Sequence, residues 1–160
     1  DDHKPAFEQA GLTLSYTPLT ESVYIQGDEQ RLQQVLRNIL VNSMRYTDAP
    51  GQTVIRMERL NDWARISIKD SLPGVPDAAL THLFERFYRV EGSRNRATGG
   101  SGLWLAICQG IVNAHSGKIY AQHSDLGGVE LVVELPLRVE PSAASSRVKK
   151  IKRGLNLGKQ

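Results

Sequence analysis

The sequence has little of what several large classes of protein require. It has one cysteine, Cys108, which excludes an internal disulfide and fits a reducing compartment. No run approaches the roughly 18 apolar residues that a membrane span needs, and the first residues lack a basic-then-apolar signal pattern. We therefore expect neither export nor membrane insertion from this sequence itself. Its 160 residues, 40% of them hydrophobic, suffice for one domain with a buried core.

The net charge of +3 is concentrated at one end of the chain. Residues 147–160 hold six Lys and Arg and no acid, which leaves 14 basic against 17 acidic residues before them. Such a segment could contact acidic lipid or nucleic acid, or be a solvated, disordered end. We assign 1–137 to the folded domain and 138–160 to a basic, disordered tail. Because the body is mildly acidic, we expect no nucleic-acid partner.

The hydrophobic pattern alternates between helix and strand periods. Asp28 is typical of an N-cap, and the apolar residues behind it predict an amphipathic helix that ends at Tyr46. A second helix is predicted from Leu103 to about His115. The polar, glycine-rich stretch 89–101 before it is typical of a functional lid or a disordered segment. The inward residues of the second helix are predicted to be Leu103, Ile107, Ile111 and Ala114.

Strand-type runs occupy most of the remaining chain. A loop or hairpin is predicted over 12–25, a pair of strands over 53–60 and 63–70, and a hairpin over 118–137 turned at Gly127 and Gly128. A short helix is predicted from Asp77 to Phe87. Regular alternation of strand and helix is absent, which disfavours a doubly wound nucleotide fold. The order favours an α+β fold, with a mixed, mostly antiparallel sheet and helices on one face.

A second stripe of residues follows the first long helix. Asn38, Asn42, Arg45 and Tyr46 fall at i, i+4, i+7 and i+8, displaced from the apolar seam. Amide oxygens suit a hydrated Mg²⁺, and a guanidinium suits phosphate oxygens. The alternative is a solvated helix flank, which needs no ligand.

Two further features suit a nucleotide. Asp70 ends an apolar strand before a Pro-Gly turn, where a carboxylate can accept a hydrogen bond from an amine such as that of adenine, or can simply start the turn. Gly74 would let a flat ring approach the backbone. Gly99, Gly100 and Gly102 precede a helix whose free N–H groups favour an anion, although neither a P-loop nor a dinucleotide motif is present.

Taken in order, these segments resemble the N, G1, F and G2 boxes of the ATP-binding domain of bacterial sensor histidine kinases. The resemblance covers about residues 11–137 and implies a Bergerat-type, two-layer α/β sandwich that binds Mg-ATP under a mobile lid. The four segments are NILVNSMRYT (38–47), DSLPGV (70–75), LFERFYRVEGS (83–93) and GGSGLWLAI (99–107).

The resemblance also implies roles for single residues. Asn42 matches the family's Mg²⁺ ligand, with Asn38 assisting, and Asp70 matches the acid that binds the adenine amine. Catalysis is then assigned to Asn38, Asn42 and Arg45, which hold the metal and the phosphates. The other positions that match nucleotide contacts are Tyr46, Gly74, Arg89 on the lid side, and Gly100, Gly102 and Leu103 of the G2 box.

Two residues depart from the family pattern. Leu72 occupies the first glycine of the D-x-G-x-G motif, and Trp104 occupies the second glycine of the G2 box. We predict that Trp104 lies about 100° from the inward seam of its helix and leans toward the phosphate site. It could block ATP, swing onto the lid, or pack harmlessly beside Phe84 or Phe87. If the two departures disable nucleotide use, the domain is a docking module instead.

A histidine kinase also needs an acceptor histidine in an H-[DE]-x-x-x-P-like helix. None of the four histidines fits this pattern. The resemblance therefore implies the catalytic part of a longer protein, which transfers the γ-phosphoryl to a histidine on a separate dimerisation domain and does not phosphorylate itself. It further implies a response regulator as partner, and a parent homodimer anchored in the bacterial inner membrane with this domain on the cytoplasmic side. A gyrase-type or chaperone-type ATPase shares the fold but should show its own domains.

Overall fold

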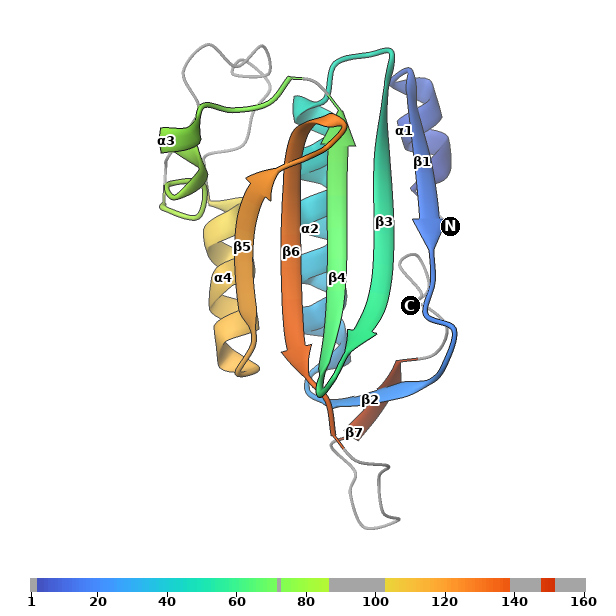
Figure 1. The fold of residues 1–160 in the computed structure, drawn as a ribbon, viewed down its shortest axis with the longest axis vertical. Helices are drawn as coiled ribbons and strands as arrows, with labels where there is room; N and C mark the ends of the chain where they lie inside the picture. Colours follow the sequence, from blue (N-terminus) through green and yellow to red (C-terminus); the bar gives the residue numbers. More distant parts are fainter. Residues whose placement is uncertain (1–2, 72, 87–102, 139–147, 152–160) are drawn as a thin grey trace.

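The computed structural model describes residues 3–71, 73–86, 103–138 and the backbone of 148–151. Five strands form one mixed sheet in the order β1-β3-β4-β6-β5, and α2 and α4 lie against one of its faces (Figure 1). This confirms the predicted α+β fold. The elements are α1 (Lys4–Gln9), β1 (Leu12–Thr17), β2 (Val23–Gln26), α2 (Glu29–Tyr46), β3 (Gly51–Leu60), β4 (Trp63–Ser71), α3 (Asp77–Leu80), α4 (Trp104–Ala114), β5 (Lys118–His123), β6 (Gly127–Pro136) and β7 (Val148–Ile151).

Helix α2 begins where its sequence predicts. The Asp28 side chain accepts hydrogen bonds from the backbone N–H groups of Gln30 and Arg31, at 3.0 and 3.3 Å, and so satisfies two donors of the first turn. The apolar seam of the helix is buried against the sheet and α4, because these side chains recur on one face. The buried seam consists of Val35, Leu36, Ile39, Leu40 and Ser43.

Strand β4 carries the core of the sheet and ends in an irregularity. Ala64, Ile66 and Ile68 are buried, and strand alternation places Asp70 on the same face, toward α2. The pairing of β4 with β6 shifts register between Lys69 and Ser71. A bulge of this kind re-aims a side chain at the end of a ladder. The fold therefore presents Asp70 to α2 at the edge of the core.

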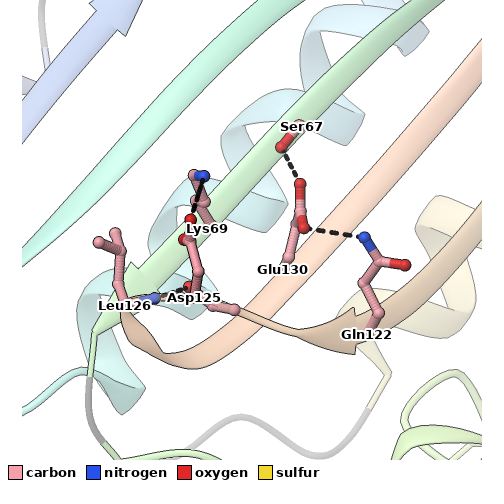
Figure 2. A network of polar contacts seen from close by, with 7 residues as sticks. Ser67, Lys69, Gln122, Asp125, Leu126 and Glu130 are labelled. Atoms are coloured by element: carbon pink, nitrogen blue, oxygen red, sulfur yellow. Dashed lines mark hydrogen bonds and ion pairs between the residues drawn. The ribbon is translucent and has the colours of Figure 1, made fainter.

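The face of the sheet turned away from α2 carries a network of polar side chains. Glu130 accepts hydrogen bonds from Ser67 Oγ and, at 2.9 Å, from Gln122 Nε2, and Lys69 Nζ lies 3.1 Å from an Asp125 oxygen (Figure 2). Long polar side chains on these strands alternate with the apolar residues of the core. One layer of helices is therefore enough to cover the apolar side of the sheet. None of the helices among the described residues is long and apolar enough to cross a membrane.

The predicted inward face of α4 is wrong in part. Ile111 packs against the core as predicted, but Ile107 is 44% exposed and Ala114 is exposed, whereas Leu105, Cys108 and Val112 are buried. Apolar residues surround most of this helix, so periodicity alone does not select one seam. Contact with α2 selects it instead, with Cys108 Sγ donating to the Val35 carbonyl at 3.7 Å. Trp104 lies one turn before Cys108, on the side that meets α2, and not 100° away from the buried seam.

Three smaller predictions also need correction. Strands β1 and β2 do not form a hairpin, because β1 pairs in parallel with β3 while β2 pairs with β7. Helix α3 begins at Asp77 as predicted but ends at Leu80. Within the basic tail, residues 148–151 form a strand, whereas the composition predicts a disordered segment. The unpaired backbone groups of β2 give these residues a partner that composition does not reveal.

Candidate functional site

The polar stripe of α2 lies beside α4 and is not a fully solvated flank. Asn38, Asn42, Arg45 and Tyr46 are all half-buried. The Asn38 side chain hydrogen-bonds the Cys108 thiol, and Arg45 meets Trp104 one turn further toward the start of α4. The two helices therefore run in opposite directions, and the C-terminal half of the stripe reaches the N-terminus of α4.

Burial explains the state of the single cysteine. Burial raises the pKa of the Cys108 thiol to about 12, although the hydrogen bond from Asn38 lowers it in part. The free thiol is therefore protonated and unreactive near neutral pH. Its role is to pack α4 against α2 beside the polar stripe.

The Asp70 carboxylate lies among hydrogen-bond donors between the sheet and α2. Its carboxylate accepts from Val129 N–H at 2.8 Å and from Ser43 Oγ at 3.2 Å, and Ser43 Oγ is itself 2.8 Å from Thr53 Oγ1. Burial raises the pKa of Asp70 from 3.8 to about 6, although bonds from Val129, Ser43 and Thr47 lower it in part. The group is still a hydrogen-bond acceptor at neutral pH, when it is mostly ionised.

Thr47 is a third donor beside Asp70. The residue is 1% exposed, and the hydrogen bond from its side chain lowers the pKa of the Asp70 carboxyl in part. An exocyclic amine that approaches Asp70 would find a buried carboxylate already oriented by its neighbours.

The start of β6, just after the turn from β5, is a part of the site that sequence reasoning missed. A Cβ on Gly128 would overlap the Asp70 carboxylate and lie 2.6 Å from the Asp70 carbonyl oxygen. The glycine thus lets the next residue, Val129, donate its N–H to Asp70. The paired glycines at 127 and 128 signalled only a hairpin turn, because their contact with Asp70 is made across the sheet.

Gly74 packs on the same turn. A Cβ there would lie 2.9 Å from the Gly127 carbonyl oxygen, so the chain after β4 runs close to the start of β6. Leu103 is the residue before α4, is half-buried and provides no side-chain cap. Leu72, Phe87, Arg89, Gly99, Gly100 and Gly102 lie outside the described residues, so their assignments stay predictions.

The Trp104 ring lies against Arg45, on the side of the candidate phosphate site toward which the sequence predicts it to lean. The Arg45 guanidinium carbon lies 4.8 Å from the centroid of its ring, which is a cation-π distance. Phe84, the predicted neighbour that the structure describes, packs against the main core. Trp104 stands where the family has a glycine, and its ring therefore lies on Arg45, a residue of the candidate phosphate site.

The donors available for a metal ion are amides. No three His, Cys, Asp or Glu side chains gather into a metal site in the described part of the chain. Asn42 and Asn38 offer amide oxygens at the helix surface, which suit a hard cation that keeps most of its water or phosphate ligands. The residues therefore fit a Mg²⁺ that arrives with a polyphosphate, and not a metal held by the protein alone.

These features lie around the C-terminal part of α2. Asp70 and the start of β6 offer an acceptor and close backbone approach on the side that faces the sheet, which suits an amine-bearing ring. Arg45 and the start of α4 offer positive charge on the side that faces α4, which suits an anion. A nucleotide combines these two chemistries in one molecule.

Comparison with known proteins defines the class. A family model described as "Histidine kinase-, DNA gyrase B-, and HSP90-like ATPase" matches residues 27–139. The chain belongs to this family. Its fold matches the nucleotide-free catalytic domain of histidine kinase ThkA with a TM-score of 0.73, at 24% identity over 84% of each chain. Full-length ShkA in complex with AMPPNP matches with a TM-score of 0.71, at 26% identity over 88% of this chain and 28% of that one.

Within the family, the chain is the ATPase domain of a sensor histidine kinase. It is 53% identical over 131 residues to the signal transduction histidine-protein kinase BaeS of Escherichia coli (strain K12). The match covers 82% of this chain and 28% of that protein, so the chain spans under a third of its relative. The resemblance inferred from the four boxes is confirmed.

Proposed function

We propose that this domain binds Mg-ATP and presents the γ-phosphoryl to a histidine on a separate dimerisation domain of its sensor kinase. The observation that carries the proposal is the buried Asp70 carboxylate, which Val129 N–H and Ser43 Oγ orient beside the C-terminal part of α2. The likeness to ShkA, solved with an ATP analogue, supports it. So does the family to which the chain belongs.

The residues would act by holding the nucleotide. Asp70 accepts the adenine amine, Gly74 lets the ring lie against the backbone, and Tyr46 lines the nucleotide. Asn42, with Asn38, would ligate a Mg²⁺, which supplies charge neutralisation for the phosphates when bound. Arg45 and the start of α4 stabilise negative charge on the transferring group, and Arg89, Gly100, Gly102 and Leu103 complete the phosphate contacts.

The acceptor histidine is assigned to another domain, because none of the four histidines stands in an H-[DE]-x-x-x-P-like segment. Both ring nitrogens of His115 are hydrogen-bonded, His82 lies 2.6 Å from Glu85, and His123 contacts Asp77. The proposed partners are therefore the dimerisation and phosphotransfer domain of the same kinase and a response regulator. The parent is proposed to be a homodimer anchored in the bacterial inner membrane, with this domain on the cytoplasmic side.

Calorimetric titration with a non-hydrolysable ATP analogue, with and without Mg²⁺, tests the proposal. We expect micromolar to sub-millimolar affinity that depends on Mg²⁺ in the native chain, and loss of that dependence in Asn42→Ala. Asn113→Ala, on the exposed side of α4, is the matched control and should bind as the native chain does. Absence of binding in the native chain would refute the proposal.

The second candidate is a docking module in which Leu72 and Trp104 prevent nucleotide use. The position of the Trp104 ring on Arg45 is the observation that favours it. The two candidates differ in the effect of Trp104→Gly on ATP affinity. Restored binding in this variant, after none in the native chain, would establish the docking module as the better description.

A further inference from the structure

Arg45 is held by an aromatic ring and by no acid among the residues that the structure describes. Its guanidinium carbon lies 4.8 Å from the centroid of the Trp104 ring, and both side chains are half-buried. Lys118 lies on the ring of Trp63 in the same way, whereas the exposed Arg59 pairs with the Glu21 carboxylate at 2.9 Å. Arg45 is therefore one of two cations in the described part of the chain that lie on a ring face.

An aromatic partner and an acidic partner have different consequences for a cation. A carboxylate would neutralise the guanidinium and occupy its N–H donors. A ring face attracts the same cation through its quadrupole while leaving the charge in place and the N–H groups in the guanidinium plane available. The contact with Trp104 therefore orders Arg45 and leaves its charge and its N–H donors available to a phosphate.

The position of Trp104 in α4 fixes where Arg45 is ordered. Side chains in a helix lean toward its N-terminus, so the ring stays at the start of α4. Among the described residues, no side chain caps the backbone N–H groups of that first turn. The ring thus keeps the Arg45 charge beside a second source of positive potential.

We propose that Trp104 is a positioning residue that pre-orders Arg45 for the phosphate groups of the nucleotide. The proposal rests on the function proposed above, and it assigns to Trp104 a role opposite to that of a plug. An arginine side chain has many rotamers, and ordering it before binding removes that entropy cost from the binding step. Trp104 should then raise the affinity for a nucleotide whose phosphate contacts Arg45.

The test compares an ATP analogue with adenosine, which lacks phosphate. Trp104→Leu keeps an apolar helix former but removes the ring, and we expect it to weaken binding of the ATP analogue about three- to tenfold. Adenosine affinity should stay unchanged, and Trp104→Phe should lose less than Trp104→Leu. In an Arg45→Met background, Trp104→Leu should have no further effect, because the two residues act as one unit.

Trp63 provides the matched control. Its ring holds Lys118 at 5.1 Å in a similar contact, at the end of β4 away from Asp70. Trp63→Leu should leave both affinities unchanged. In a Trp63→Phe background, Trp104 is the only tryptophan, so its emission should respond to the ATP analogue and not to adenosine.

The possible outcomes separate the two proposals. Binding of the ATP analogue by the native chain, with equal weakening by Trp104→Leu whether or not Arg45 is present, would overturn the positioning role and leave the proposed function intact. Tighter binding by Trp104→Leu would likewise overturn it and favour a plug. A native chain that binds neither adenosine nor the ATP analogue would overturn the proposed function and the positioning role together. Upfield-shifted Arg45 side-chain protons, lost in Trp104→Leu, would support the contact without any nucleotide.

Discussion

His115 Nε2 accepts a hydrogen bond from the backbone N–H of Asp28, at 3.0 Å, and so joins the end of α4 to the start of α2. The other ring nitrogen, Nδ1, lies 2.8 Å from the Ile111 carbonyl oxygen and therefore donates to it. This network assigns a neutral ring with its proton on Nδ1. The two helices that carry the candidate site are thus fastened to each other at the end opposite to Arg45 and Trp104.

Removing this link should destabilise the domain. We expect His115→Ala to lower the free energy of unfolding by about 1–3 kcal/mol, because it leaves the Asp28 N–H and the Ile111 carbonyl without their partner. Urea denaturation at neutral pH measures the change. His82→Ala, which removes an exposed hydrogen bond with Glu85, serves as control and should change stability by less than about 1 kcal/mol. Equal effects of the two variants would contradict the fastening role.

Gly27 is expected to be intolerant of a side chain because of the same ring. A Cβ there would lie 2.7 Å from His115 Nε2, and no backbone atom lies as near. Gly27→Ala should therefore cost about 1–3 kcal/mol in the native chain. In a His115→Ala background the cost should be much smaller, since the space is then open. Additive costs in the double variant would argue against direct contact.

Asp70→Asn should make the domain more stable and weaken its binding of ATP. The raised pKa means that the folded state takes up a proton between about pH 4 and pH 6, so the contribution of Asp70 to stability falls as pH rises through that window. An asparagine side chain cannot carry the buried charge, so this variant should be more stable than the native chain at pH 7, by about 1–3 kcal/mol, with the gain vanishing near pH 4. Thermal unfolding across pH measures it.

The same substitution should weaken ATP binding, because an amide presents fewer acceptors to the adenine amine than a carboxylate does. Native affinity for the ATP analogue should also decline as pH falls below about 6, where Asp70 becomes protonated. Calorimetry at pH 5 and pH 7.5 tests this. An Asp70→Asn variant that binds as tightly as the native chain at both values would remove Asp70 from the adenine side of the site.

Gly128→Ala should damage the site through the backbone. The added Cβ would meet the Asp70 carbonyl oxygen at 2.6 Å and overlap its carboxylate, so we expect a loss of about 1–3 kcal/mol in stability together with weaker ATP binding. Gly110→Ala is the matched control, because a Cβ there meets nothing within 4 Å. That variant should gain about 0.5–1 kcal/mol from helix propensity and bind normally.

Local signals predicted most elements well, because each depends on neighbours in sequence. The Asp28 cap, the seam of α2 and the β5-β6 hairpin need only helix spacing, strand alternation and a glycine turn. The six-residue helix α1 was missed, since it is too short for a period to show and is anchored by one buried residue, Phe7. Long-range pairing was also missed, as with β7 on β2.

For the candidate site, too, local signals were predictable from the sequence and long-range contacts were not. The residue types and their order in the N, G1, F and G2 boxes are enough to indicate the family. The partners of those residues come from elsewhere in the chain: Val129 and Gly128 meet Asp70 across the sheet, and Trp104 meets Arg45 across two helices. Spacing in sequence carries no information about such contacts.

The sequence by itself determined the family, the α+β class and the polar stripe of α2, because these follow from composition, periodicity and the order of motifs. Only the tertiary structure decided which side of α4 is buried, and with it the place of Trp104. An almost uniformly apolar helix can bury several faces, and the partner that packs against it selects one. Because the side of α4 that meets α2 is the buried one, Trp104 lies beside Arg45 and not 100° from the buried residues.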